Sequence, residues 1–237
     1  MQDAVQISLM EVNAVRSVRI WFEKLGRLQY ISHLDMNRLM ARVVRRAEIP
    51  IWYTEGFNPH PYINFLLPLP LFTQSKCEIM DIRITDDTSN EEIMKKFNAF
   101  MPDGMRVTKV ADTWGKATEI AYSQYDMVFV PNGDSEECFM KISECLMGEE
   151  LIIVKKQKQG KRKIDKEVNL IEEIHSFYVS MTEDGAVNID IILPSGTVKT
   201  VNPRFLTDAI LRDTGIDVKS VSVTRKRVMN ANLEDFE

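Results

Sequence analysis

The spacing of apolar and polar residues along the first half of the chain predicts alternating strands and helices. Strand-like patterns occur at 17–22, 62–71, 76–85 and 105–114. A helical period predicts one helix from Ser32 to about Glu48, ended by Pro50, and a second helix within 86–104. The resulting order β-α-β-β-α-β is typical of the split βαβ unit of ferredoxin-like domains.

The same pattern recurs after a predicted linker at 115–121. Strands are predicted at 124–131, 150–156 and 218–229, a hairpin at 175–194, and helices at 135–148 and 202–215. A charged excursion at 156–168 interrupts this second unit, and we expect the tail from Asn230 onward to be frayed. The sequence therefore predicts the α+β class, with two tandem ferredoxin-like domains at 15–114 and 122–230.

The first predicted helix concentrates positive charge on one surface. Asp35, Arg38, Arg42 and Arg45 recur at helical spacings, and Arg46 lies beside them. A guanidinium group offers a planar fork of donors, which suits phosphate or carboxylate oxygens. These five residues are therefore candidates for binding a nucleic-acid backbone. An amphipathic helix with a solvated face, partly neutralised by its acidic residues, would have the same pattern.

A loop rich in aromatic residues, glycine and proline follows this helix. Trp52, Tyr53, Phe57 and Tyr62 are candidates for stacking on bases, and Asn58 lies beside them in the GFNPHP segment as a candidate binding residue. Together with the arginines of the preceding helix, this loop predicts a local binding site for RNA.

A second basic stretch occupies the charged excursion of the second unit. Seven lysines and arginines lie between Lys155 and Lys166, around Gly160. At the tip of a hairpin, Lys161 and Arg162 are candidates for gripping a nucleic-acid backbone through salt-sensitive contacts. A solvated loop that protects the edge of the sheet from aggregation would have the same composition.

Two of the three histidines flank the arginine-rich helix and are candidate catalytic residues. His33 lies in its first turn, and His60 lies in the loop behind it. A general base must come within about 3 Å of its proton, whereas the two ends of the helix in a split βαβ unit lie apart. Both histidines therefore also fit structural roles, His33 within its turn and His60 within its loop.

Composition and missing motifs restrict the function further. The net charge of −5 opposes a protein that coats nucleic acid by bulk charge, so any contact must be local. The three cysteines are scattered, and the sequence has no nucleotide phosphate loop, zinc motif, serine elbow or iron–sulfur motif. It therefore predicts no cofactor and no metal. The first residues do not resemble a signal peptide and no window could span a membrane, so we expect a cytoplasmic protein.

A long segment around the first helix closely resembles a bacterial family of radical SAM-linked proteins. The hallmarks present are YISHLD at 30–35, RRAEIP at 45–50 and GFNPHP at 56–61, with Glu78 and Asp81 on a later strand. The segments KRKIDKEV, NPRFLTDAIL and VTRKRV are also similar, so the resemblance covers nearly the whole chain. One departure lies in LPLFTQSKCE, where family members usually carry a glycine after the second leucine.

The resemblance implies a partner rather than an activity. Family members occur fused to, or encoded beside, radical SAM proteins, and the fold-level layout is remotely similar to that of CRISPR repeat-processing endoribonucleases. We therefore expect an RNA-binding or substrate-presenting accessory protein without independent enzymatic activity, which presents ribosomal or transfer RNA to a radical SAM partner. Two alternatives are a metal-independent endoribonuclease with His33 as general base, and a module that docks a protein without RNA.

Overall fold

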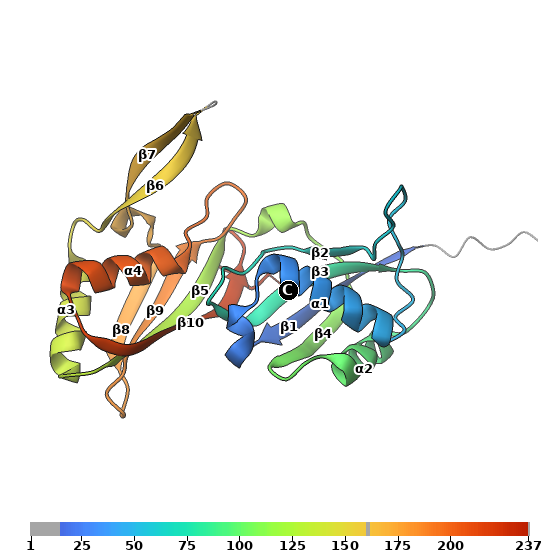
Figure 1. The fold of residues 1–237 in the computed structure, drawn as a ribbon, viewed down its shortest axis with the longest axis horizontal. Coiled ribbons are helices and arrows are strands. Elements are labelled where there is room, and N and C mark those ends of the chain that lie inside the picture. The colour runs from blue at the N-terminus through green and yellow to red at the C-terminus, as the bar shows by residue number, and fades with distance from the viewer. Residues whose placement is uncertain (1–14, 160–161, 237) are drawn as a thin grey trace, which may run out of the picture.

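The computed structural model describes residues 15–159 and 162–236, and it confirms the α+β class. The described residues form one large, mostly antiparallel sheet, a separate hairpin and four α-helices (Figure 1). The strands are β1 (Arg16–Lys24), β2 (Ile63–Phe65), β3 (Gln74–Ile84), β4 (Met105–Asp112), β5 (Tyr122–Pro131), β6 (Ile152–Gln159), β7 (Arg162–Asn169), β8 (Ser176–Met181), β9 (Val187–Pro194) and β10 (Val218–Met229). The helices are α1 (His33–Arg46), α2 (Asn90–Phe100), α3 (Ser135–Met147) and α4 (Pro203–Thr214). None of these described helices is long and apolar enough to cross a membrane.

The large sheet runs through both halves of the chain. Its order is β4-β1-β3-β10-β5-β9-β8, and β2 pairs with the edge of β3 that also meets β10. The first half thus has the order β4-β1-β3-β2, and the second half has the corresponding order β10-β5-β9-β8. The halves join through a short parallel contact, in which Gln74 pairs with Thr224 and Ser75 pairs with Arg225.

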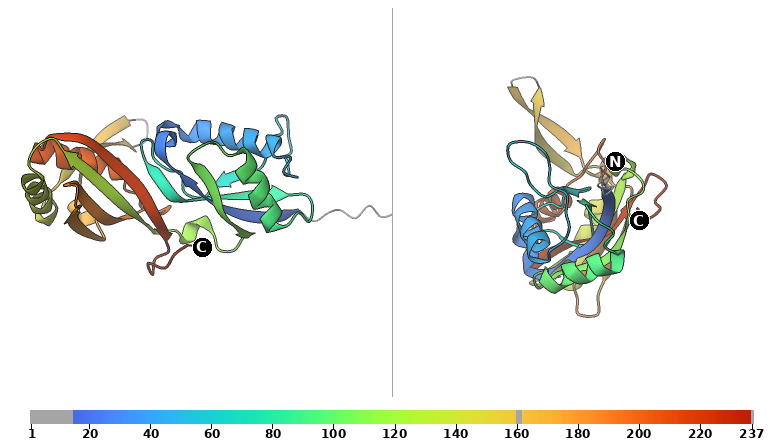
Figure 2. Two further views of the ribbon diagram at one scale, coloured as in Figure 1. Left: turned by 90° about the horizontal axis from the view of Figure 1, so that it is seen from below. Right: turned by 90° about the vertical axis from the view of Figure 1, so that its right-hand side faces the viewer.

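The helices pack on the sheet with their apolar faces inward. Met40 and Val43 of α1 lie in one core with Met80, Ile82 and Ile84 of β3. Because side chains alternate along a strand, the intervening residues of β3 point to the opposite side of the sheet. Helices α3 and α4 cover a second core in the other half, and α4 lies on the same side as α1 (Figures 1 and 2). We call this side the helix layer and the opposite side the open face.

A buried ion pair lies where the two halves join. Arg225 of β10 donates to Glu78 of β3 at 2.5 Å and to the Leu67 carbonyl at 3.1 Å, and both charged side chains are almost fully buried. Burial alone would lower the pKa of Arg225, but the Glu78 carboxylate raises it above its ordinary value. Lys24 is also buried there, and burial lowers its pKa, an effect that Glu78 opposes. The junction between the two halves is therefore held by this ion pair as well as by the pairing of β3 with β10.

The three cysteines are free thiols. Burial raises the pKa of each thiol, and it raises that of Cys77 to about 11. Because the thiolate is the reactive form, these side chains behave at neutral pH as small apolar groups rather than as nucleophiles.

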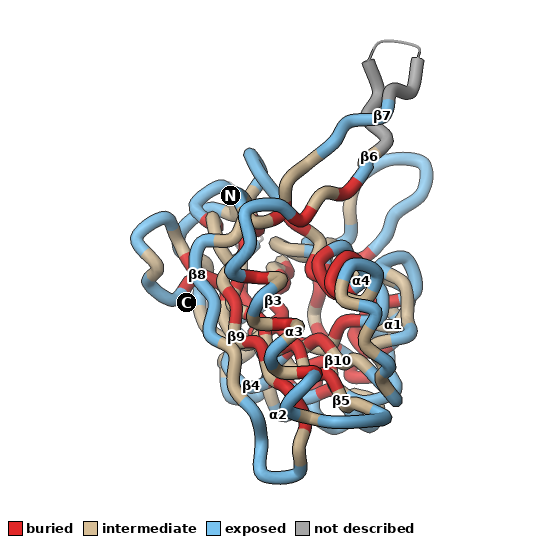
Figure 3. The backbone as a smooth tube through the Cα atoms, turned by 90° about the vertical axis from the view of Figure 1, so that its left-hand side faces the viewer, coloured by how far each residue is buried: buried red, intermediate tan, exposed pale blue. Residues whose placement is uncertain are grey.

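Three local predictions are corrected by the structure. β2 ends at Phe65, because the prolines that follow it cannot donate to a strand ladder. β6 does not join the main sheet but pairs with β7 in a hairpin that projects away from the buried core (Figure 3). The tail is not frayed up to Phe236, since Asp235 bridges to Met229 and the Phe236 ring is buried.

Candidate functional site

The arginines of α1 lie on the side of the helix that faces away from the sheet. Ser32 caps the helix, and a buried stripe that includes Met36 and Met40 faces the core. Arg38, Arg42 and Arg45 lie on the opposite, exposed side, with Asp35 and Arg46 at its margin. We call these five charged residues the arginine face.

The arginines differ in how they are held by the protein. Arg38 forms an ion pair with Asp35 at 3.2 Å, and the Arg46 guanidinium lies over an aromatic ring of α2. Arg42 and Arg45 have no hydrogen-bond or ion-pair partner among the described residues. The donors of these two side chains are therefore available to an anionic ligand such as phosphate.

Asp35 is held in its charged form by local contacts. The Ser32 hydroxyl donates to its carboxylate at 2.7 Å and lowers the pKa of Asp35, and the Arg38 guanidinium lowers that pKa further. The same hydroxyl accepts from the backbone N–H of Asp35 at 3.1 Å. This capping arrangement orders the first turn of α1 and the arginine next to it.

Replacing Ser32 by alanine is expected to lower the free energy of unfolding by about 1 kcal/mol, because the helix loses its cap. The pKa of Asp35 is expected to rise toward its ordinary value, since the hydroxyl donor is removed. Urea unfolding and NMR titration of the carboxyl groups measure the two effects. Ser32→Thr, which keeps a hydroxyl, serves as control, and an unchanged Asp35 titration in Ser32→Ala would contradict this account.

Exposed rings and cations gather where the two halves meet on the helix layer. Tyr30, at the end of the 3₁₀ helix η1 (Gly26–Tyr30), packs edge-on against Phe72 with ring centroids 5.9 Å apart. Arg204 of α4 lies 4.5 Å from the centre of the Phe72 ring, and Lys155 of β6 lies 5.2 Å from that of Phe205. All three rings are more than one-third exposed. We call these five residues the seam cluster.

Phe72 holds a backbone conformation that is uncommon for a bulky residue. Its φ is 63°, in the left-handed region that favours glycine. Its N–H donates to the Gln29 carbonyl at 2.8 Å, which ties this loop to η1. Since strained backbone is concentrated at functional sites, this conformation adds to the case for the seam cluster as a binding surface.

The aromatic residues of the loop after α1 lie in different surroundings. Phe57 is fully exposed at its tip, and Asn58 next to it is exposed. Trp52 and Tyr62 instead pack around Arg83, with their ring centres 5.3 and 4.4 Å from its guanidinium carbon. Because the neighbours of Arg83 in β3 face the core, Arg83 and its two rings lie on the open face. The prediction that Trp52 and Tyr62 form one binding site with the arginines of α1 is therefore wrong.

The two candidate histidines are held within separate segments. The His33 ring contacts the Asn37 amide at 3.1 Å and lies edge-on to Phe65. The His60 ring contacts the Thr54 hydroxyl at 3.0 Å within the loop behind the helix. In the part of the chain that the structure describes, neither ring contacts a carboxylate or another histidine. The structure does not bring them together as an acid–base pair.

The β6–β7 hairpin begins at the seam cluster. Lys155, near the start of β6, belongs to that cluster, and Lys166 is exposed on β7. Lys161 lies outside the described residues, and Arg162 is described only as the first backbone position of β7. The basic stretch thus leads away from the seam cluster along a projecting hairpin (Figure 1).

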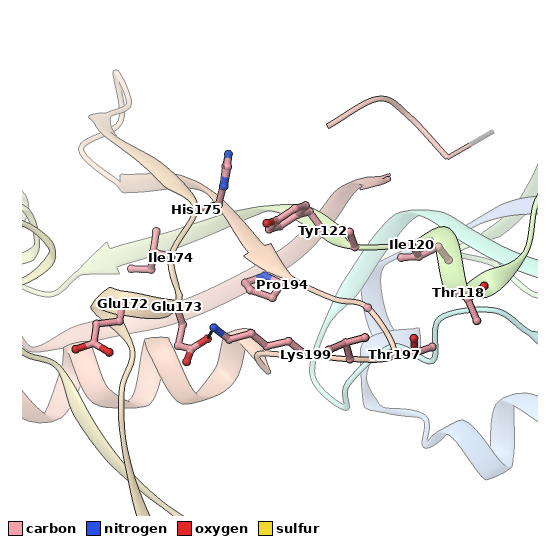
Figure 4. Close-up of a pocket in the computed structure, with 13 residues that line it drawn as sticks. Thr118, Ile120, Tyr122, Glu172, Glu173, Ile174, His175, Pro194, Thr197 and Lys199 are labelled. Carbon is pink, nitrogen blue, oxygen red and sulfur yellow. Dashed lines mark ion pairs between the residues drawn. The ribbon is translucent and has the colours of Figure 1, made fainter. Parts of the chain in front are cut away.

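A cavity of about 360 Å³ lies beside the turn that follows β9, and its lysine is already paired with one of its two glutamates (Figure 4). Lys199 forms an ion pair with Glu173 at 2.5 Å, and His175 packs on Tyr122 with ring centroids 5.0 Å apart. Across residues 15–159 and 162–236, no three His, Cys, Asp or Glu side chains are placed to share a metal ion. We therefore locate the candidate site at the arginine face and the seam cluster.

Four members of the seam cluster are not among the binding residues that the sequence predicts: Tyr30, Phe72, Arg204 and Phe205. Phe72 lies far from Arg204 in the sequence, and their contact depends on the pairing of β3 with β10. The available signal was that Arg204 and Phe205 belong to NPRFLTDAIL, one of the segments that carry the family resemblance.

Comparison with known proteins identifies a family. Residues 17–203 match the family model described as "Uncharacterized protein conserved in bacteria (DUF2344)". No curated protein matches the chain. The solved structure titled "Crystal Structure of a Cbf5-Nop10-Gar1 Complex" matches with 9% identity and a TM-score of 0.42, covering 89% of this chain and 48% of that chain. The "Crystal Structure of an Unknown Protein from Galdieria sulphuraria" matches with 5% identity and a TM-score of 0.26, covering 88% of this chain and 98% of that chain. This chain spans about half the length of the first of these structures.

Proposed function

We propose that this chain, which belongs to the DUF2344 family of uncharacterised bacterial proteins, binds single-stranded RNA on its helix layer. The observation that carries the proposal is the seam cluster, whose exposed rings and cations lie between the arginine face and the β6–β7 hairpin. Exposed rings stack on unpaired bases, and arginines bind the phosphates between them. The net charge of −5 restricts this binding to the local basic surface.

We also infer that residues 15–114 and 122–230 are two tandem ferredoxin-like domains. Support comes from the strand orders β4-β1-β3-β2 and β10-β5-β9-β8, in which equivalent strands occupy equivalent places. On this interpretation the β6–β7 hairpin is an insertion after α3. The contact between β3 and β10 then joins the helix layers of the two domains into one surface for RNA.

The resemblance to radical SAM-linked proteins adds a partner to this proposal. The chain would present a bound ribosomal or transfer RNA to a radical SAM protein, and copurification of the tagged chain with that protein tests the partnership. Cleavage of RNA with His33 as general base has less support, because its ring is held by Asn37 and Phe65. Docking of the partner without RNA predicts copurification without any RNA binding.

Replacing Phe72 by glycine tests the RNA-binding proposal. Glycine adopts a φ of 63° without strain, so the free energy of unfolding is expected to change by less than about 1 kcal/mol. Loss of the stacking ring is expected to weaken the binding of single-stranded RNA about tenfold. Fluorescence anisotropy with a labelled single-stranded RNA, and with a duplex of the same sequence, measures this loss and the preference for unpaired bases.

Tyr178→Ala serves as the matched control, because Tyr178 is an exposed ring on β8 outside the seam cluster. Its RNA affinity is expected to equal that of the wild type. Absence of RNA binding by the wild type at about 50 mM salt, where phosphate contacts are strong, would contradict the proposal. If Phe72→Gly binds RNA as tightly as the wild type does, the seam cluster is not part of the RNA-binding surface.

A further inference from the structure

A cavity on the open face contains an arginine whose side-chain donors have no hydrogen-bond partner among the described residues. The cavity has a volume of about 410 Å³, and Arg83, Trp114, Lys116 and Glu119 are among the residues that line it. Two aromatic rings hold the Arg83 guanidinium, but no described residue accepts a hydrogen bond from it. Stacking therefore fixes the orientation of this side chain and leaves its N–H groups for a ligand.

A second arginine of the cavity has a structural role instead. Arg19 is almost fully buried and donates to both carboxylate oxygens of Asp81, at 2.8 and 3.1 Å. It also donates to the carbonyls of Trp114 and Gly115. These bonds balance the charge of Asp81 and hold the segment that carries Trp114 against the sheet. Arg83 and Lys116 are then the lining cations without a described ion-pair partner.

Trp114 and Glu119 add two further binding features. Trp114 is 56% exposed, and one side of its ring stacks on Phe236 with centroids 6.3 Å apart, which leaves the other side open to a flat ligand. One carboxylate oxygen of Glu119 accepts from the backbone N–H of Lys116 at 3.0 Å. Its other oxygen has no hydrogen-bond partner among the described residues and can accept from hydroxyl groups.

We propose that this cavity binds a nucleoside 5′-phosphate. The phosphate lies on the fork of Arg83 and near Lys116, the base stacks on Trp114, and the ribose hydroxyls donate to Glu119. A free mononucleotide and the 5′-phosphorylated end of an RNA carry this same chemistry. Because the cavity and the arginine face lie on opposite sides of the sheet, this proposal does not rest on RNA binding by the helix layer.

Isothermal titration of the full chain tests the proposal with adenosine and uridine 5′-monophosphates, inorganic phosphate, and oligoadenylates with and without a 5′-phosphate. We expect nucleotide binding that Arg83→Met weakens about tenfold or more, because methionine keeps an apolar stem between the rings but offers no donors. The control pair is Lys95→Gln with Arg106→Gln, two exposed residues that do not line the cavity, and we expect it to leave the nucleotide affinity unchanged.

The results of these titrations distinguish a free mononucleotide from the 5′-phosphorylated end of an RNA as the ligand. Arg83-dependent binding of the 5′-phosphorylated oligoadenylate alone would support the site and assign it to an RNA end. Three results would overturn the proposal. They are binding of inorganic phosphate as tight as that of the monophosphates, nucleotide binding that Arg83→Met leaves unchanged, and no binding of any of the probes. Trp114→Leu is the second variant if Arg83→Met lowers the melting temperature. It should weaken the binding of the monophosphates but not that of phosphate.

Discussion

Replacing Glu78 by alanine is expected to lower the free energy of unfolding by about 3–5 kcal/mol, the range for a broken buried ion pair. The Glu78 carboxylate lies 2.5 Å from Arg225, and both side chains are almost fully buried. Lys24 is buried at the same junction and is stabilised in its charged form by the same carboxylate. The variant would therefore keep two buried cations and lose the anion that balances them. Chemical denaturation of the two proteins measures the difference.

The loss of stability in Glu78→Ala is expected to depend on pH through Lys24. Burial lowers the pKa of Lys24 below 10.5, Glu78 raises it, and Arg225 lowers it, so removal of Glu78 lowers it further. Between this lowered pKa and 10.5, the unfolded chain binds more protons than the folded chain, and stability rises with pH. We therefore expect a smaller destabilisation at about pH 9.5 than at pH 7. An equal loss at both pH values would exclude Lys24 as the titrating group.

The double variant Glu78→Leu with Arg225→Met is the matched control for this prediction. Replacing both members of a buried ion pair by apolar residues of similar size is often neutral, whereas removing one leaves a buried charge. We expect the double variant to recover the part of the stability lost in Glu78→Ala that is due to the unpaired Arg225, because Lys24 remains buried without its anion. If it is as unstable as the single variant, the unpaired Arg225 does not account for the loss, which then comes from Lys24 or from the packing of the Glu78 side chain.

The elements that the sequence predicts correctly are those with local signals. The helix expected from Ser32 to about Glu48 is α1, His33–Arg46, with Ser32 as its cap. The cap and the buried stripe lie within one short segment, so their spacing contains the information needed. The exposure of Arg42 and Arg45 follows from the same helical period. This part of the candidate site was therefore predictable in detail.

The features that could not be predicted depend on contacts between distant segments. The alternation in 150–156 identifies a strand, but it does not reveal that β6 pairs with β7 alone. Glu78 and Arg225 meet because β3 and β10 pair, and neither residue carries a local mark of that partner. From the resemblance, a glycine is the expected residue at the position of Phe72, and the φ of 63° there is one that glycine adopts without strain. What the phenylalanine contacts there, Arg204 of α4, depends on the packing of the two halves.

Replacing Arg42 and Arg45 together by glutamine is expected to weaken the binding of single-stranded RNA about 25-fold at 0.1 M salt. Each phosphate contact on a single strand contributes a slope of about −0.7 to the dependence of log affinity on log salt. Two lost contacts should therefore reduce that slope by about 1.4, which corresponds to the stated loss at 0.1 M. Both side chains are exposed and have no described partner, so the fold is expected to be unaffected.

The salt dependence distinguishes a phosphate contact from the general field of the protein. Lys95→Gln with Arg106→Gln is the matched control, because these exposed residues lie on α2 and β4, outside the arginine face and the seam cluster. Both double variants make the net charge more negative by two from its value of −5, so a long-range effect would weaken binding similarly in each. A contact at the arginine face instead predicts a changed slope only in Arg42→Gln with Arg45→Gln. Equal losses in the two double variants would therefore assign the effect to overall charge and exclude α1 as the RNA-binding helix.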